Sequence, residues 1–253
     1  MSQSKLNIDS HAENYIEELS RDSSFEAVLS KARKRQVLRS MRLYKHSNIL
    51  EIGCGLNPLF PCISDYKKYI IVEPSKEFAE FAESIDKKGK DVLVINGFLE
   101  DVISECGGQS FDFIFLSGVL HQVPQPESLL RTLYGLCGRD SVVHINVPNA
   151  FSFHRLLAVE MAYIETIFEK SETNAKLQVN WIFDKDSLIR LVQENEFDVL
   201  DFGTYFIKLF TNEQMEKLIA EDILKKDVIN GLENMIKYMP DMGCEMFVNL
   251  RAK

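Results

Sequence analysis

The stretch NILEIGCGLNPLF, from Asn48 to Phe60, decides the fold. Its apolar start predicts a buried strand, and the two glycines that follow predict a tight turn. Glycine has no Cβ and accepts unusual backbone dihedrals, so a Gly-x-Gly turn lets a ligand approach the main chain closely. The stretch therefore predicts a ligand site at the carboxyl end of a first strand.

Further apolar runs predict the rest of a sheet. They are KYIIVEP (68–74), DVLVING (91–97), FDFIFLSG (111–118), SVVHINVP (141–148), a strand or hairpin DVLDFGTYFIKLF (198–210), and EMFVNLRA (245–252). A helical pattern or a loop follows each of the first four of these runs and the opening one. Strands that alternate with helices in this way form a parallel sheet covered by helices on both faces.

The domain organisation follows from the segments around these runs. Apolar residues at three- and four-residue steps predict two helices in an N-terminal helical segment, residues 1–45. Residues 46–253 form one domain in this interpretation, with a helical cap inserted at about 149–183. The helix after the cap begins at a capping Asp184, and two more helices precede the last strand.

Charge and composition restrict the partners. The 253 residues include 29 basic and 38 acidic side chains, a net charge of −9, which repels nucleic-acid polymers and anionic membrane surfaces. The basic run from Lys31 to Lys45 is an exception, interpreted as the solvated face of an amphipathic helix. No apolar run approaches the roughly 18 residues that span a bilayer. We therefore expect a small-molecule partner and leave a homodimer open.

The cysteines and the N-terminus indicate the compartment. Five cysteines are scattered without a C-x-x-C pair or a histidine at zinc-ligand spacing, so we expect no metal site. The first twenty residues lack the apolar core of a signal peptide. Both observations predict a protein of the reducing cytoplasm.

Residues around the glycine turn distinguish between two adenosine cofactors. Glu73 ends the second strand twenty residues after Gly53, where a carboxylate can accept hydrogen bonds from ribose hydroxyls. A dinucleotide site requires a small residue where Pro58 stands, so that a helix N-terminus can meet the pyrophosphate. Glu51 would repel a pyrophosphate but attract an ammonium group. An NAD-dependent oxidoreductase is therefore disfavoured.

Glu51, Gly53 and Gly55, with Asn57 in the place of a third glycine, make the series resemble the first motif of class I S-adenosylmethionine-dependent methyltransferases. The resemblance continues in order along residues 45–150 through IIVEPS, NGFLEDV and FDFIFLSGVLHQVPQPESLL. It implies a Rossmann-like, seven-stranded, mostly parallel sheet and S-adenosylmethionine as the cofactor. The implied cofactor-binding residues are Glu51, Gly53, Gly55, Asn57, Glu73, Pro74, Phe98, Leu99, Glu100, Ser117 and Gly118.

Beyond Pro148 the chain resembles type 11/12-like methyltransferases that modify sugars or cell-surface polysaccharide precursors. This resemblance implies O-methylation of a small sugar- or nucleotide-linked acceptor, with a phosphorylated acceptor included. Two alternatives stay open. One is a methyltransferase-like binding module without turnover, and the other is an N-methyltransferase of a small metabolite.

Histidines near strand ends are the candidates for a general base, because imidazole titrates near neutral pH. His121 follows the fourth strand and His154 lies in the cap, and each has a structural alternative, as a local helix cap or a surface residue. His144, inside the fifth strand, is interpreted as a core histidine. Candidates for binding the acceptor are Asn149, Arg155 and Trp181, whose alternatives are a turn, a solvated charge and core packing.

Overall fold

The computed structural model describes residues 7–21, 23–108 and 110–253, and in these residues seven strands form one sheet in the order β3-β2-β1-β4-β5-β7-β6. All neighbours pair in parallel except β7, which runs antiparallel to β5 and β6. The predicted seven-stranded, mostly parallel Rossmann-like sheet is confirmed. The strands are β1 (Asn48–Ile52), β2 (Lys68–Glu73), β3 (Val92–Asn96), β4 (Phe111–Ser117), β5 (Cys137–Pro148), β6 (Phe197–Tyr205) and β7 (Glu245–Ala252).

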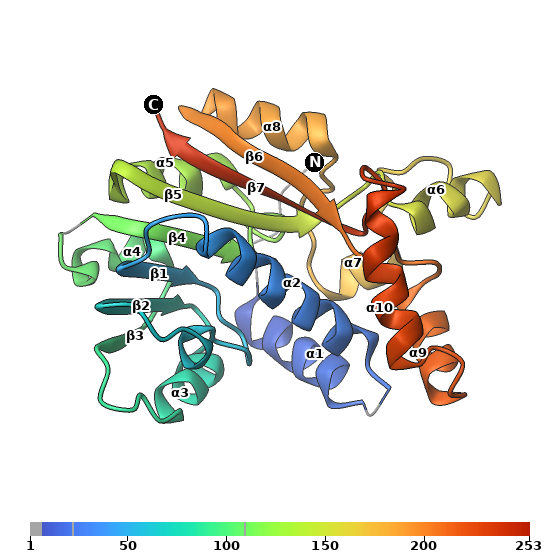
Figure 1. Cartoon of the computed structure of the whole chain (residues 1–253), viewed down its shortest axis with the longest axis horizontal. Coiled ribbons are helices and arrows are strands. Elements are labelled where there is room, and N and C mark those ends of the chain that lie inside the picture. Colours follow the sequence, from blue (N-terminus) through green and yellow to red (C-terminus); the bar gives the residue numbers. More distant parts are fainter. Residues whose placement is uncertain (1–6, 22, 109) are drawn as a thin grey trace.

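Helices cover both faces of this sheet because side chains alternate along each strand. In β1, Leu50 and Ile52 pack into one core cluster, whereas Ile49 packs into another. The first cluster is covered by α4 (Leu99–Val102), α5 (Pro126–Leu136) and α8 (Lys185–Glu194), and the second by α2 (Phe25–Met41) and α3 (Lys76–Ser84). The result is a three-layer α/β/α arrangement (Figure 1).

The remaining helices gather at the edge of the sheet where the parallel strands end (Figure 1). They are α1 (Ile8–Ser20), α6 (Phe153–Glu160), α7 (Glu172–Lys176), α9 (Asn212–Ala220) and α10 (Lys226–Asn234). Short 3₁₀ turns lie at Phe60–Cys62, Ile103–Cys106 and Met235–Lys237. A third core cluster joins the start of α2 to α9 and α10 through Phe25, Phe206 and Met215. These helices together cover the carboxyl ends of the strands, and two of them, α6 and α7, belong to the cap at residues 149–183.

Backbone contacts close the base of the cap, residues 149–183. The ends of the segment 149–183 are held together, since Asn149 bridges Phe183 and the N–H of Ala150 donates to the Phe183 carbonyl at 2.8 Å. The cap contains two short helices, α6 and α7. The α8 helix begins at Asp184, whose side chain accepts from the N–H of Ser187, as the sequence predicted.

Helix α2 of the N-terminal segment is part of the domain core. Val37 and Met41 of α2 lie in the same core cluster as Ile49 and Phe113 of the sheet. Of the predicted N-terminal segment, residues 1–6 and 22 lie outside the described residues. Within the described part of the chain, no helix is both long and apolar enough to cross a membrane.

Candidate active site

A cavity of about 420 Å³ lies between the carboxyl ends of the strands and the cap. Its size falls in the range of about 300–1,000 Å³ typical of small-molecule sites. Most of the residues that the sequence predicted for a site line this one cavity: Gly53, Gly55, Glu73, Pro74, Phe98, Leu99, Glu100, Ser117, Gly118, His121, Asn149, His154 and Arg155. They come from five different chain segments, and only the folded sheet brings them together.

The glycine turn has the dihedrals that its sequence predicted. Gly53 and Gly55 have φ values of 72° and 53°, in the region that favours glycine. A Cβ on Gly53 would lie 2.5 Å from Cγ2 of Val119, and one on Gly55 would lie 3.3 Å from Cε1 of Tyr15. These glycines are thus required by the close approach of two parts of the protein as well as by a ligand.

Gly118 differs from both, because its added Cβ would meet no atom within 4 Å in the described part of the chain. Its φ is 76°, and it follows Ser117 at the end of β4. A side chain here would project into the cavity. Gly118 therefore keeps open the space that a ligand lying across the ends of β1 and β4 would fill.

Glu73 is held rigidly at the end of β2. Its two carboxylate oxygens accept from two backbone donors, Gly55 N–H at 3.0 Å and Ser75 N–H at 2.9 Å. The side chain is almost completely buried, and this burial raises the pKa of its carboxyl group. An ionised carboxylate can accept about four hydrogen bonds, so two positions remain for a ribose diol.

The residues after β3 form an apolar wall. Leu99 is buried, whereas Phe98 is 43% exposed and Glu100 is exposed. Gly97 precedes them with a φ of 159°, and a Cβ there would lie 2.5 Å from Cγ1 of Val102. An aromatic ring and an aliphatic side chain at this point suit a flat base such as adenine.

Three predicted residues are not part of the cavity lining, of the residues that the structure describes: Glu51, Asn57 and Trp181. The Glu51 carboxylate points under the turn, where its Oε2 accepts from Tyr69 Oη at 2.6 Å and from Leu59 N–H at 3.2 Å. Burial raises its pKa to about 7. The Glu51 carboxylate thus fastens the 53–59 loop to β2, and its contact with a cofactor ammonium stays a prediction.

Asn57 is exposed, and Trp181 is half-buried against the core. The Trp181 indole donates from Nε1 to the Val123 carbonyl at 3.1 Å and stacks on Phe183. This is the core-packing alternative that the sequence left open.

Three histidines line the cavity with an Nδ1 that has no hydrogen-bond partner among the described residues: His11, His121 and His154. Burial lowers the pKa of His121 to about 3, and burial also holds the pKa of His154 well below its usual value. Both rings are therefore neutral near pH 7. The backbone carbonyl of His121 accepts from the N–H groups of Asn180 and Trp181, which attaches the end of the cap to this residue.

His144 is the buried core histidine that the sequence predicted. Its Nδ1 lies 2.6 Å from Asn249 Oδ1, its Nε2 lies 3.1 Å from Asn146 Oδ1, and its ring stacks between Phe113 and Phe247. Burial lowers its pKa to about 4. Polar contacts continue from Asn146 to the Ser117 hydroxyl at the cavity.

Asn149 and Arg155 line the cavity, but their side chains bind backbone groups of other residues of the protein. Both amide hydrogens of Asn149 are used, on the carbonyls of Asp241 and Gly243, and its Oδ1 accepts from Phe151 N–H. Arg155 donates to the carbonyls of Ile167 and Glu169 within the cap. These contacts match the turn-forming alternative for Asn149, and they give Arg155 a structural task that the sequence did not suggest.

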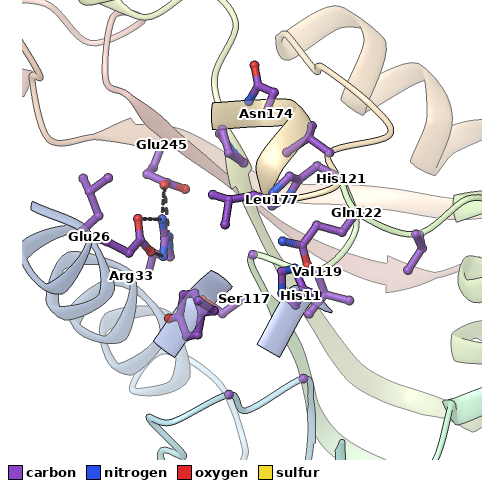
Figure 2. Close-up of a pocket in the computed structure, with 18 of the residues that line it drawn as sticks. His11, Glu26, Arg33, Ser117, Val119, His121, Gln122, Asn174, Leu177 and Glu245 are labelled. Atoms are coloured by element: carbon purple, nitrogen blue, oxygen red, sulfur yellow. Dashed lines mark hydrogen bonds and ion pairs between the residues drawn. The ribbon is translucent and has the colours of Figure 1, made fainter. Parts of the chain in front are cut away.

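Sequence reasoning missed three charged residues that line the cavity, Glu26, Arg33 and Glu245. Arg33 of α2 donates to Glu26 Oε1 at 2.6 Å and to Glu245 Oε1 at 2.9 and 3.0 Å, as Figure 2 shows. Glu26, Leu29 and Arg33 occupy steps of three and four along α2, so a charged pair on a partly apolar helix face was the available signal. Within the basic run, Arg33 thus differs from the solvated face that was expected.

The N-terminal helix α1 also contributes, through Ile8, His11 and Tyr15. The Tyr15 ring packs edge-on against Phe78 with centroids 6.0 Å apart, and His11 stacks on Tyr15. Helix α1 is tied to the cap by Gln178, which exchanges two hydrogen bonds with the backbone of Asn7. The cavity is therefore closed partly by a segment that precedes the sheet in sequence.

A sequence profile for the family described as "Methyltransferase domain" matches residues 22–201. The chain belongs to this methyltransferase family. It is a class I S-adenosylmethionine-dependent methyltransferase, as the ordered motifs predicted. No curated protein matches this methyltransferase in sequence.

Solved structures share its fold. The plantazolicin methyltransferase BamL, solved with S-adenosylhomocysteine, matches with a TM-score of 0.59 at 15% identity over 97% of this chain and 94% of BamL. The N-methyltransferase NodS from Bradyrhizobium japonicum gives 0.57 at 12% identity over 96% and 99%. A methyltransferase from Thermotoga maritima gives 0.56 at 17% identity over 90% and 89%. At these identities the likeness establishes the fold alone.

The cavity of the methyltransferase fits S-adenosylmethionine. Gly118 leaves open space beside the turn of Gly53 and Gly55, the Glu73 carboxylate has unused acceptor positions, and Phe98 offers an apolar surface. These groups suit an amino-acid chain, a ribose diol and a base, in that order along the sheet edge. The individual contacts of these residues with the cofactor stay predictions.

Proposed function

We propose that this methyltransferase methylates a hydroxyl group of a small, polar acceptor of the sugar type. The observation that carries the proposal is a set of imidazoles that line the cavity with an unpartnered Nδ1: among the described residues they are His11, His121 and His154, of which His121 and His154 are neutral near pH 7. Buried polar atoms normally have partners, so these nitrogens mark positions where an acceptor hydroxyl would bind.

The chemistry is an in-line displacement. The cofactor, when bound, supplies an electrophilic methyl group on a sulfonium. A neutral His121 or His154 can accept a hydrogen bond from the acceptor hydroxyl and take its proton as the new oxygen–carbon bond forms. Exclusion of water from the cavity by the bound reactants would favour transfer to the acceptor over hydrolysis.

The proposal extends to the setting of the enzyme. A small-molecule acceptor, biosynthesis of cell-surface polysaccharide or a related compound, a cytoplasmic location, and a homodimer as one assembly are carried from the sequence analysis. The net charge of −9 supports a partner other than a nucleic-acid polymer or an anionic membrane. The cavity volume of about 420 Å³ supports a small molecule because it lies in the range typical of small-molecule sites.

The test is turnover of a panel of sugars and sugar nucleotides, measured as formation of S-adenosylhomocysteine together with a methylated product. We expect His121→Gln or His154→Gln to lower kcat by about 100-fold or more, as general-base catalysis contributes roughly 10²–10⁴. His46→Gln is the matched control, because His46 is not among the described residues that line the cavity and its ring pairs with Asp65. Unchanged kcat in both cavity variants would refute the role of the histidines.

The second candidate function is N-methylation of a small amine. Two carboxylates that line the cavity, Glu26 and Glu245, favour it. A carboxylate can bind an ammonium group before methyl transfer. Amines in the same panel test it directly. Binding of S-adenosylhomocysteine with no turnover of any acceptor would favour the binding module instead.

A further inference from the structure

A buried ion cluster lines the cavity across from His11, His121 and Gln122, as Figure 2 shows. It consists of Arg33 between Glu26 and Glu245, and the Glu245 side chain is 3% exposed. Arg33 comes from α2 and Glu245 begins β7, so the cluster joins the N-terminal and C-terminal ends of the domain. Its three residues line the cavity, and none of them is among the cofactor-binding residues that the sequence predicted.

The hydrogen bonds of this cluster are unevenly shared. Arg33 donates twice to Oε1 of Glu245, from Nε and Nη2, and its Nη1 donates to Glu26. Glu245 Oε2 has no partner among the residues that the structure describes. A buried carboxylate oxygen that lacks a donor carries a desolvation cost, which a ligand donor can offset. Burial accordingly raises the pKa of the Glu245 carboxyl group.

The unpartnered buried atoms concentrate at the cavity. In the described residues there are seven such side-chain atoms, and four belong to residues that line the cavity: His11, His121, His154 and Glu245. All four are able to accept a hydrogen bond, given a suitable tautomer for each ring. An occupant of this space is thus selected for its hydrogen-bond donors.

The cations that line the cavity are already engaged by the protein. Arg33 binds two carboxylates, Arg155 binds two backbone carbonyls, and Lys208 donates to Asn212 Oδ1 at 2.5 Å. Burial lowers the pKa of Lys208, which further reduces its value as a binding site for an anion. A phosphate placed here would meet the carboxylates of Glu26 and Glu245.

We propose that Glu245, oriented by Arg33, is the specificity-determining residue of the acceptor site, where its free Oε2 accepts a hydrogen bond from a hydroxyl or amine of the acceptor and excludes phosphorylated acceptors. This inference rests on the proposed function, and it narrows the acceptor that the sequence allowed to be phosphorylated. Arg33 is a positioning residue, since it acts through the carboxylate that it holds.

The test uses three sugars that share one ring and differ in one group: glucose, glucosamine and glucose 6-phosphate. Each sugar is added to the full chain saturated with S-adenosylhomocysteine. Saturation-transfer NMR detects binding, and titration of the sugar in the same experiment gives its dissociation constant. We expect glucose or glucosamine to bind and glucose 6-phosphate to bind at least about tenfold more weakly. Glucosamine binding above glucose assigns the donor to an amine, and equal binding assigns it to a hydroxyl.

The variant Glu245→Gln replaces the free oxygen by a donor, so binding of the favoured sugar should fall by about tenfold or more. Glu213→Gln, an exposed site paired with Lys217, is the matched control. The inference is overturned if glucose 6-phosphate binds best, if Glu245→Gln binds as the wild type does, or if none of the three sugars binds. The ranking of the three sugars on the wild type holds even if the variant does not fold.

The same samples separate this inference from the proposed function. Failure of the protein to bind S-adenosylhomocysteine would contradict the methyltransferase function itself. Normal binding of S-adenosylhomocysteine with the wrong sugar ranking would overturn the role of Glu245 alone.

Discussion

Replacement of Glu73 by glutamine should weaken cofactor binding although the two side chains have nearly the same shape. Both carboxylate oxygens of Glu73 accept from backbone donors, Gly55 N–H and Ser75 N–H. A glutamine has only one oxygen, so its NH₂ group must face one of these N–H donors. The turn around Gly55 loses an anchor, and the ribose diol loses a charged acceptor.

The magnitude follows from these contacts. A hydrogen bond to a charged group is worth about 1.5–3 kcal/mol, so loss of one to the ribose weakens binding of S-adenosylhomocysteine by about 10- to 150-fold. The unpaired backbone donor lowers the free energy of unfolding by a further ~1–3 kcal/mol. Calorimetric titration measures the first effect, and urea unfolding without ligand measures the second.

Glu77→Gln serves as the control, because Glu77 is exposed on the first turn of α3, only four residues away. It should change neither quantity by more than about 0.5 kcal/mol, as expected for a surface site. If Glu73→Gln bound S-adenosylhomocysteine within twofold of the wild type, the assignment of Glu73 to the ribose would be refuted.

Two further predictions concern stability. The pKa of His121 is about 3 in the folded protein against 6.5 as its ordinary value. The unfolded chain therefore binds more protons between these values, and His121 lowers stability as pH falls below 6.5, by about 2 kcal/mol at pH 5. His121→Gln should reduce the loss of unfolding free energy between pH 7.5 and pH 5 by this amount, and an unchanged pH profile would contradict the buried neutral imidazole. Gly53→Ala should destabilise the protein by at least about 1–2 kcal/mol, because its φ is 72° and its Cβ would lie 2.5 Å from Val119 Cγ2. Adding Val119→Ala should restore only the part due to the clash, measured by a double-mutant cycle in urea, and simple additivity would argue against that contact.

Much of the fold could be predicted because its signals are local. Each predicted apolar run corresponds to a strand, from Asn48–Ile52 to Glu245–Ala252, and Asp184 caps α8 as expected. Periodicity and capping depend on neighbours within a few residues, so a single sequence contains them. The cap was harder, since the sequence predicted only a helical insert, which in the structure consists of the two short helices α6 and α7.

The candidate site divides in the same way. The glycine turn, Glu73 and the residues after β3 and β4 line the cavity because the carboxyl ends of parallel strands meet at one edge. The hydrogen bonds of Glu51 with Tyr69 and Leu59 could not be predicted, since the spacing of Glu51 from Gly53 does not tell which side chains surround it.

By itself the sequence determined the class of fold, the cofactor and the edge of the sheet where the site lies, since these follow from alternating patterns and a short motif. Only the tertiary structure decided what the acceptor meets. Arg33 and Glu245 are 212 positions apart in the chain, yet they form one ion pair at the cavity. A contact over such a separation leaves no periodicity or spacing in the sequence, and it arises because β7 inserts beside β5 while α2 packs across the same edge.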